Sequence, residues 1–406
     1  MYRFNLSRLA RAAAIVVAIA GLSIPPATAS ATNNIHALRS AVPQSSRALP
    51  VDGFNFKTIF DFKAPGPVQP TAGLVTINSW FYGTTAGGGT LSYGTLYSLS
   101  PGGSMRILHN FGGPGDGRAP ASTLVYANNL LYGTTPYGGA HGFGTVFSIN
   151  TAGAEQVLWN FHGGTDGAFP QAGLTFSDGL LYGTTASGGN PNQEGTVFSI
   201  SPTGQEHVIY RFRGFPDAGR PDASLVKIGS VLYGTTATQG ASGNGAVFAV
   251  NAADGKEWIV HSFSGRPDGS GPEAGLISLG NTLYGVTEEG GTNANGTIYA
   301  IDQYGRETVL HNFAEADGTA PIAALTALNN TLYGTTNRGG MYDGGTIFSA
   351  STTGAFSKLY DLNILSGSAP SSAMLNWNGH LIGTTSYGAG TGCRGVGCGS
   401  VFELTF

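Results

Sequence analysis

Short runs of apolar residues alternating with Thr, Ser and Gly recur along most of the chain, and turns rich in Gly, Asn, Asp and Pro separate them. One representative unit contains four such runs, at Gly173–Phe176, Leu180–Thr185, Thr196–Ile200 and Glu206–Phe212. Tyr, Phe, Val, Ile and Thr dominate the runs, a composition typical of half-buried β-strands. No run has the spacing of an amphipathic helix. The pattern therefore predicts an all-β protein built of short strands.

The four-run unit repeats along the chain with a period near 50 residues. Its second run carries a Gly-x-Thr motif, at Gly83, Gly133, Gly183, Gly234, Gly285, Gly334 and Gly383. Another Gly opens its third run, at Gly94, Gly144, Gly195, Gly245, Gly296, Gly345 and Gly399. Periods of this size are typical of propellers and solenoids, and the coils of a solenoid are usually shorter. We therefore expect a seven-bladed β-propeller of four-stranded antiparallel blades.

The two ends of the repeat array predict how the ring closes. The array begins with a lone run of the fourth type, Phe56–Phe62, and ends just after a run of the third type, Ser400–Leu404. The last sheet therefore lacks its outermost strand, and the first residues of the array can supply it. Closure of this kind removes the exposed edges that a linear array has to cap.

Positions that recur in every unit have a packing interpretation, because an active site needs its groups only once. The Gly of Gly-x-Thr lies within a strand, where Gly normally weakens pairing, so we expect it to mark a close approach of the neighbouring blade. The residue before it is Tyr in six units and Ile382 in the seventh. This predicts an aromatic layer between the blades.

The N-terminal residues have the three-part layout of a secretory signal peptide. Basic Arg3, Arg8 and Arg11 precede an apolar run, and the small residues Ala27 and Ala29 fit a cleavage site after Ala29. An uncleaved membrane anchor is the alternative, but the run is shorter than the ~20 residues that span a bilayer. We expect 1–29 to be a signal peptide, 30–53 a flexible leader and 54–406 the propeller. The mature protein is expected to be secreted, in the periplasm or outside the cell.

Charge and cysteine content limit the partners. The net charge is −4, and it becomes about −7 without the three Arg residues of the signal segment. A nucleic-acid partner is disfavoured, because backbone binding needs a basic surface. No later stretch is long and apolar enough for stable membrane insertion, and we expect a monomer. Cys393 and Cys398 are the two cysteines, and in an exported protein they predict a disulfide; a metal site would need further ligands, and none is close in sequence.

The LYGTT…GG…GTVF…LxNF…DG pattern resembles the bacterial tandem-repeat family called GloVer. The resemblance covers about 54–406 and is specific, because the motif recurs seven times. It implies an exported protein, and it implies no activity. Many members carry C-terminal anchors, whereas this sequence shows neither an apolar tail nor a sorting motif before Phe406, so we do not carry surface attachment over.

Antiparallel order places the links between second and third runs, and those between units, on one rim of the ring. These links are long and Gly-rich, and they vary between units, as loop-borne binding sites commonly do. The ligand-binding candidates on this rim are Tyr137, His141, Glu288, Glu289, Arg338, Tyr342 and Asp343. Ordinary solvated loops are the alternative for any one of them.

Two other recurring features have structural interpretations. Asp residues of the Asp-Gly links, at Asp116, Asp166, Asp217, Asp268 and Asp317, are expected to cap their own turns rather than to form a cation-binding ring. His109, His261 and His311 share a fourth-run position with Phe, Trp and Tyr residues, so we expect packing there and no metal ligation. No nucleophile elbow, HExxH or phosphate-binding loop is present, and we expect no cofactor.

Two classes of function stay open. The first is a non-catalytic binding module for extracellular or envelope glycan or protein, with rim aromatics that stack on sugar rings. The second is a glycan-cleaving hydrolase or lyase whose carboxylates come from Glu288 or Glu289 with a distant partner such as Asp343. Two catalytic carboxyls must face each other across a bond at about 5–10 Å. A sequence does not show such a distance.

Overall fold

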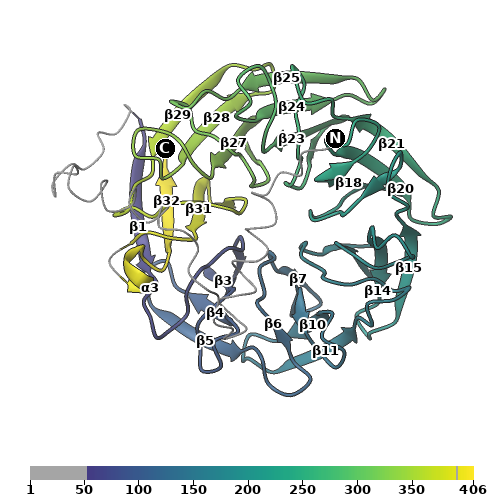
Figure 1. Ribbon diagram of the computed structural model, residues 1–406. Helices are drawn as coiled ribbons and strands as arrows, with labels where there is room; N and C mark the ends of the chain where they lie inside the picture. The colour runs from purple at the N-terminus through teal and green to yellow at the C-terminus, as the bar shows by residue number, and fades with distance from the viewer. Residues whose placement is uncertain (1–52, 390–391) are drawn as a thin grey trace, which may run out of the picture. The chain divides into compact units, whose positions relative to one another are not determined.

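The computed structural model describes residues 53–389 and 392–406, and these form seven four-stranded antiparallel sheets. The sheets are the blades of a β-propeller (Figure 1). The predicted signal peptide and nearly all of the predicted leader lie outside the described residues. The first three blades, each given from inner to outer strand, are β2 (Val75–Ile77), β3 (Trp80–Thr85), β4 (Thr95–Leu99) and β5 (Met105–Asn110); β7 (Val125–Ala127), β8 (Leu130–Thr135), β10 (Thr145–Ile149) and β11 (Glu155–Asn160); β12 (Thr175–Ser177), β13 (Leu180–Thr185), β14 (Thr196–Ile200) and β15 (Glu206–Arg211).

Blades 4 to 6 repeat the same order. Their strands are β17 (Val226–Ile228), β18 (Val231–Thr236), β20 (Ala246–Asn251) and β21 (Glu257–Ser262); β22 (Ile277–Leu279), β23 (Thr282–Thr287), β24 (Thr297–Ile301) and β25 (Glu307–Asn312); β26 (Thr326–Leu328), β27 (Thr331–Thr336), β28 (Thr346–Ser351) and β29 (Phe356–Asp361). Two short ribbons, β6 (Gly117–Arg118) with β9 (Tyr137–Gly138) and β16 (Ala218–Gly219) with β19 (Thr238–Gln239), join neighbouring blades.

The seventh blade closes the ring as the sequence predicts. Its inner strands are β30 (Leu375–Trp377), β31 (His380–Thr385) and β32 (Ser400–Thr405), and β1 (Asn55–Asp61) is its outer strand. β1 pairs antiparallel with β32, from Asn55 opposite Thr405 to Asp61 opposite Ser400. The two ends of the array thus share one sheet, in which the purple and yellow strands lie side by side in Figure 1.

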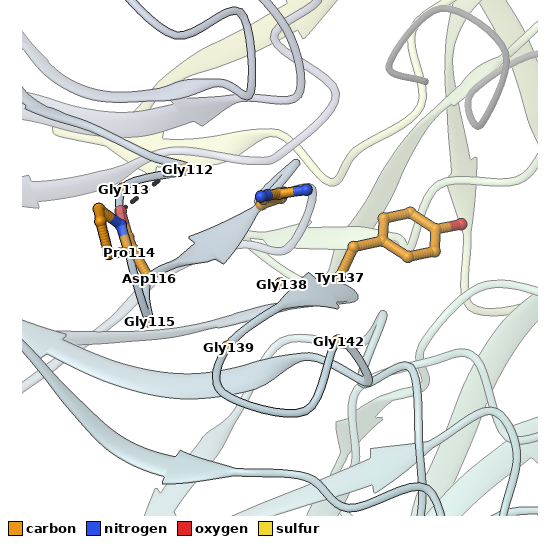
Figure 2. Close-up of a pocket in the computed structure, with 10 residues that line it drawn as sticks. Gly112, Gly113, Pro114, Gly115, Asp116, Tyr137, Gly138, Gly139 and Gly142 are labelled. Carbon is orange, nitrogen blue, oxygen red and sulfur yellow. Dashed lines mark hydrogen bonds between the residues drawn. The ribbon is translucent and has the colours of Figure 1, made fainter. Parts of the chain in front are cut away.

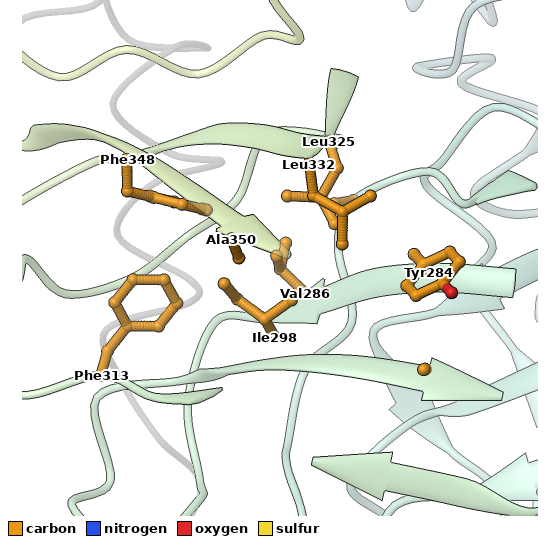
Figure 3. Close-up of a cluster of buried hydrophobic side chains, with 10 residues drawn as sticks. Tyr284, Val286, Ile298, Phe313, Leu325, Leu332, Phe348 and Ala350 are labelled. Carbon is orange, nitrogen blue, oxygen red and sulfur yellow. The ribbon is translucent and has the colours of Figure 1, made fainter. Parts of the chain in front are cut away.

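The core consists of apolar layers between adjacent blades. In the layer between blades 5 and 6, Tyr284 and Ile298 pack against Leu325 and Phe348 (Figure 3). The Tyr before each Gly-x-Thr, and Ile382 in the seventh unit, lies in such a layer in every blade. The predicted aromatic layer between blades is therefore confirmed.

The prediction that the Gly of Gly-x-Thr makes room for the neighbouring blade was wrong, because the Gly makes room for a side chain of its own blade. Cross-strand pairing puts Gly183 opposite Phe198 of the same blade. A Cβ at Gly183 would lie 2.6 Å from the Phe198 Cζ atom and 2.9 Å from Leu174 Cδ2, both within blade 3. The Gly makes room for the aromatic ring of its own blade, and that ring then faces the neighbouring blade.

The Thr of Gly-x-Thr holds the base of the long rim loop by hydrogen bonds in six of the seven blades. In blade 5 the Thr287 hydroxyl donates to the Glu289 carbonyl (2.9 Å), lies 2.9 Å from Thr297 Oγ1 and accepts the Thr297 N–H (3.1 Å). Blade 4 differs, because Ala246 stands where the other blades have Thr or Ser. Thr236 Oγ1 is accordingly buried without a hydrogen-bond partner among the residues that the structure describes.

The longest rim loop, in blade 7, contains α3 (Gly392–Gly395), a single helical turn. Cys393 and Cys398 form a disulfide there, as the sequence predicts. Within residues 53–389 and 392–406, no helix has the length and apolar character needed to cross a membrane.

Candidate functional site

The long loops lie on one rim, and a bridge between two backbone segments recurs there in every blade. The bridges pair Val68 with Gly87, Arg118 with Tyr137, Ala168 with Ser187, Gly219 with Thr238, Ser270 with Glu289, Thr319 with Arg338 and Ser368 with Tyr387. The predicted residues Tyr137, Glu289 and Arg338 therefore occupy one equivalent rim position in blades 2, 5 and 6. His141 and Tyr342 likewise occupy equivalent positions at the tips of their loops.

A cavity of about 430 Å³ opens on this rim between blades 1 and 2 (Figure 2). Its walls are two Gly-rich segments, the link that follows β5 and the loop that follows β8. The lining residues are Gly112, Gly113, Pro114, Gly115, Asp116, Arg118, Tyr137, Gly138, Gly139 and Gly142. So many Gly residues leave backbone groups open to close approach by a ligand.

Asp116 shapes the first wall of this cavity. Its Oδ1 accepts the Gly117 N–H (2.6 Å), and its Oδ2 accepts the Gly112 N–H (3.0 Å). The Gly139 N–H in turn donates to the Asp116 carbonyl (2.6 Å), which ties the two walls together. A side chain at Gly138 would meet that carbonyl at 2.6 Å, so the second wall also needs Gly.

Arg118 supplies the positive charge of the cavity. Its guanidinium carbon lies 4.3 Å above the centre of the Tyr93 ring, and its Nε is sealed from solvent without a hydrogen-bond partner in the described part of the chain. A buried N–H without a partner is costly, but a nitrogen closed to solvent is also closed to a ligand, so the donors that a ligand could reach are the terminal nitrogens of the guanidinium. Arg118 was missed in the sequence analysis, although the other six units have Val, Ala, Gly, Ser or Thr at its position.

Tyr137 pairs with Arg118 through its backbone and lines the second wall. Its ring extends away from the Gly112–Asp116 link (Figure 2) and lies 5.8 Å from the Phe169 ring, half-buried. Burial raises the pKa of the Tyr137 phenol, so the hydroxyl stays protonated at neutral pH and can donate a hydrogen bond. His141, on the same loop, stacks on His162 with ring centres 4.1 Å apart.

The other predicted residues lie on blades 5 and 6. Glu288 is only 7% exposed, and Glu289 beside it is half-buried. The N–H groups of these residues donate to the carbonyls of Gly271 and Ser270 (both 2.9 Å). Asp343 accepts the Gly339 N–H (2.9 Å) and so closes its own loop. Arg338 is exposed and Tyr342 half-buried, and none of these residues lines the cavity between blades 1 and 2.

The Asp residues of the Asp-Gly links cap their own turns, as predicted. Each Oδ2 accepts a backbone N–H three or four residues earlier, from Gly112, His162, Arg213, Ser264 or Ala314. The ring slot of the fourth strand also packs as predicted, for example His109 edge-on to Phe111 at 4.7 Å.

The sequence analysis missed a Glu from the following blade at four of these junctions. Glu155, Glu206, Glu257 and Glu307 each begin the outer strand of a blade, next to the Asp of the preceding blade. Burial, and then the negative charge of that Asp, raise the pKa of each Glu to about 7. A Gly-x-Glu sequence, at Gly153, Gly204, Gly255 and Gly305, is the signal that could have revealed them.

Comparison with known proteins gives a family and a fold. The model of the Gloeobacter/Verrucomicrobia repeat family matches residues 48–248 and 220–406. No curated protein matches the chain.

Among solved structures, the oligogalacturonate lyase from Vibrio parahaemolyticus is similar with a TM-score of 0.53 at 10% identity, over 87% of this chain and 97% of that one. TolB from Acinetobacter baumannii has a TM-score of 0.40 at 12% identity, over 65% and 58%. The tricorn protease has a TM-score of 0.41 at 11% identity, over 72% of this chain and 26% of its own length. The chain thus spans just over half of TolB and about a quarter of the tricorn protease. At these identities the likeness shows the fold alone.

Proposed function

Because the chain belongs to the Gloeobacter/Verrucomicrobia repeat family and carries a polar cavity on its variable rim, we propose that it is a non-catalytic binding module for extracellular or envelope glycan. The observation that supports this most is Arg118, whose guanidinium stacks on Tyr93 and whose side chain lines a cavity of about 430 Å³. That volume is in the range of small-molecule sites. It suits one or two sugar units rather than a protein surface.

The chemistry of the cavity fits a sugar. The guanidinium, fixed by stacking on Tyr93, donates hydrogen bonds in a planar array that suits ring hydroxyls or a carboxylate. The Gly-rich walls offer backbone groups, and beyond the second wall the Tyr137 ring offers an apolar face with a hydroxyl that stays protonated. Export of the chain, which its first 29 residues predict, would bring the site to the glycans of the envelope.

A glycan array followed by calorimetric titration of any ligand found would test the proposal. We expect Arg118→Ala to weaken binding by at least tenfold, since a hydrogen bond to a charged group contributes about 1.5–3 kcal/mol. Arg118→Lys should restore little, because an ammonium lacks the planar array. Tyr137→Ala should also weaken binding.

Variants on blade 6 provide the matched comparison. Arg338→Ala and Tyr342→Ala change the same rim far from the cavity, and we expect both to bind like the wild type. Loss of binding in these variants, with Arg118→Ala unaffected, would place the site on blades 5 and 6 and refute the cavity. Turnover of a bound glycan that Glu288→Gln abolishes would show a glycan-cleaving enzyme instead.

A further inference from the structure

The junctions between outer strands bring together side chains that lie one repeat apart in sequence. The outer strands, such as β5 and β11, form the perimeter of the ring (Figure 1). The turn before each outer strand packs against the outer strand of the preceding blade. A Cβ at Gly153, for example, would lie 2.3 Å from the Leu108 carbonyl oxygen. Glu155 therefore comes next to His109 and Asp116.

Two of these junctions hold a His, an Asp and a Glu. His109, Asp116 and Glu155 form one cluster and His261, Asp268 and Glu307 the other, and within each cluster the potential ligand atoms all lie within 4.8 Å of one another. The Nε2 atom lies 3.0 Å from Asp116 Oδ2 in the first cluster and 3.2 Å from Asp268 Oδ2 in the second. All six residues are half-buried.

Each cluster also contains a carboxylate oxygen that nothing in the described chain satisfies. Oε1 of Glu155 and Oε1 of Glu307 are sealed from solvent and have no hydrogen-bond partner there, and the same holds for Asp268 Oδ1. The equivalent Oε1 atoms of Glu206 and Glu257, at the junctions without a His in the slot, are in the same state, so the His is what distinguishes the two clusters. Two half-buried carboxylates side by side favour a positive charge or a proton between them.

We propose that each of the two His–Asp–Glu clusters binds one divalent transition-metal cation, with Zn²⁺ as the preferred ion. One imidazole nitrogen with two carboxylate oxygens is a donor set that suits Zn²⁺ better than Mg²⁺ or Ca²⁺, which prefer oxygen alone. Ligand atoms about 2.0–2.2 Å from a tetrahedral zinc lie about 3.3–3.6 Å apart. In the clusters the Nε2–Oδ2 distances are 3.0 and 3.2 Å and all ligand atoms lie within 4.8 Å of one another, so an ion would draw the Glu oxygen in and part the other two atoms slightly, and water would complete the coordination.

The remaining junctions show what the His contributes. Between blades 3 and 4 the slot holds Tyr210, whose hydroxyl donates to Asp217 Oδ2 (2.9 Å). Between blades 2 and 3 it holds Trp159, which offers no lone pair. In neither junction does the slot residue supply a nitrogen ligand. At the second, His162 Nδ1 lies 3.0 Å from Asp166 Oδ2 from outside the slot, and His162, Asp166 and Glu206 do not form a close cluster of ligand atoms among the described residues.

The junction between blades 5 and 6 keeps the His and lacks the Glu. Phe356 stands at that position and stacks on the His311 ring at 3.7 Å, while His311 Nε2 lies 3.4 Å from Asp317 Oδ2. His311 is therefore a matched control, with the same slot and the same Asp but no third ligand.

Metal counting on the purified full-length, tag-free chain tests the proposal. After EDTA treatment and equilibrium dialysis against micromolar Zn²⁺, bound zinc is counted by plasma mass spectrometry. We expect His109→Gln and His261→Gln each to remove one tightly bound ion and the double variant to remove two. His311→Gln and His162→Gln should remove neither, because His311 has no Glu beside it and the exposed His162, although 3.0 Å from Asp166 Oδ2, is not part of a close cluster with Glu206.

Circular dichroism establishes that each variant is folded, and Glu155→Gln and Glu307→Gln replace any His variant that is not. Loss of one ion per cluster in either series supports the proposal. A zinc count that the variants leave unchanged, or the absence of tightly bound zinc in the wild type, overturns it. Glycan binding through Arg118 is measured separately, so neither result decides the other.

Discussion

Replacing Thr287 with Val should lower the free energy of unfolding by about 2–4 kcal/mol, whereas the same change at Thr236 should not lower it. Both side chains are fully buried at the same position of neighbouring blades, and Val has nearly the shape of Thr. Thr287 Oγ1 takes part in three hydrogen bonds, with the Glu289 carbonyl, Thr297 Oγ1 and the Thr297 N–H. Each contributes about 1 kcal/mol net, and the stranded Thr297 N–H adds a further cost.

Thr236 has lost this network because Ala246 replaces its partner. A buried hydroxyl without a partner costs free energy, so Thr236→Val should be neutral or stabilise by about 1 kcal/mol. Ala246→Thr should stabilise by a similar amount, because it restores the partner. Room for the added atoms exists, since Gly240 lies beside Ala246 as Gly139 lies beside Thr145 in blade 2.

Equilibrium unfolding in guanidinium chloride measures all three variants. A shift of the midpoint with an unchanged slope indicates an effect on stability alone. Equal losses for Thr287→Val and Thr236→Val would refute the reasoning, because the hydroxyl network would then contribute nothing beyond packing.

Three further predictions concern the ring, its Gly positions and pH. Deleting residues 54–62 removes β1 and leaves an open edge on β32, so cooperative unfolding should be lost; a melt like that of the parent would show that this strand does not close the ring. Gly183→Ala should destabilise by about 2 kcal/mol through contact with the Phe198 ring, while Gly164→Ala, where a Cβ meets nothing within 4 Å, should be neutral in thermal melts. Burial and the charge of Asp166 raise the pKa of Glu206 to about 7, so its contribution to stability is complete below about pH 4.5 and is lost as the pH rises through 7. Glu206→Gln should reduce the fall in stability over that range by about 1–2 kcal/mol after allowance for solvent screening. Parallel pH profiles of the variant and the wild type would exclude this role.

The fold could be predicted from the sequence because its determinants repeat. A period near 50 residues, four β-patterned runs per unit and a lone outer run at the start were enough for the number of blades and for closure between Phe56–Phe62 and Ser400–Leu404, which the structure shows as the pairing of β1 with β32. What the pattern did not contain was the cross-strand register. The partner of Gly183 was therefore assigned to the neighbouring blade, when pairing places Phe198 of its own blade there.

The cavity and the junction clusters escaped prediction for a related reason. Each forms between two units, so its residues share no local motif. Glu155 meets Asp116 only because a turn of blade 2 leans on the outer strand of blade 1. The rim candidates were chosen as unusual residues within loops, and the structure distributes them over blades 2, 5 and 6 rather than in one place. Arg118 was overlooked because it lies in the link between units, where only the Asp and the Pro were compared.

The position of Arg118 also explains how one blade of a regular ring can acquire a site without loss of stability. The bridge that it forms with Tyr137 is made by backbone atoms, and six other units make the equivalent bridge with residues from Gly to Val. The side chain there is thus not needed for folding, whereas Thr287 or Gly183, which pack inside the blades, cannot vary in this way. Arg118→Ala should therefore leave the free energy of unfolding within about 0.5 kcal/mol of the wild type, as surface substitutions usually do, while it weakens glycan binding. A large loss of stability in this variant would mean that the guanidinium on Tyr93 is part of the packing, and the argument that this side chain serves a ligand would fail.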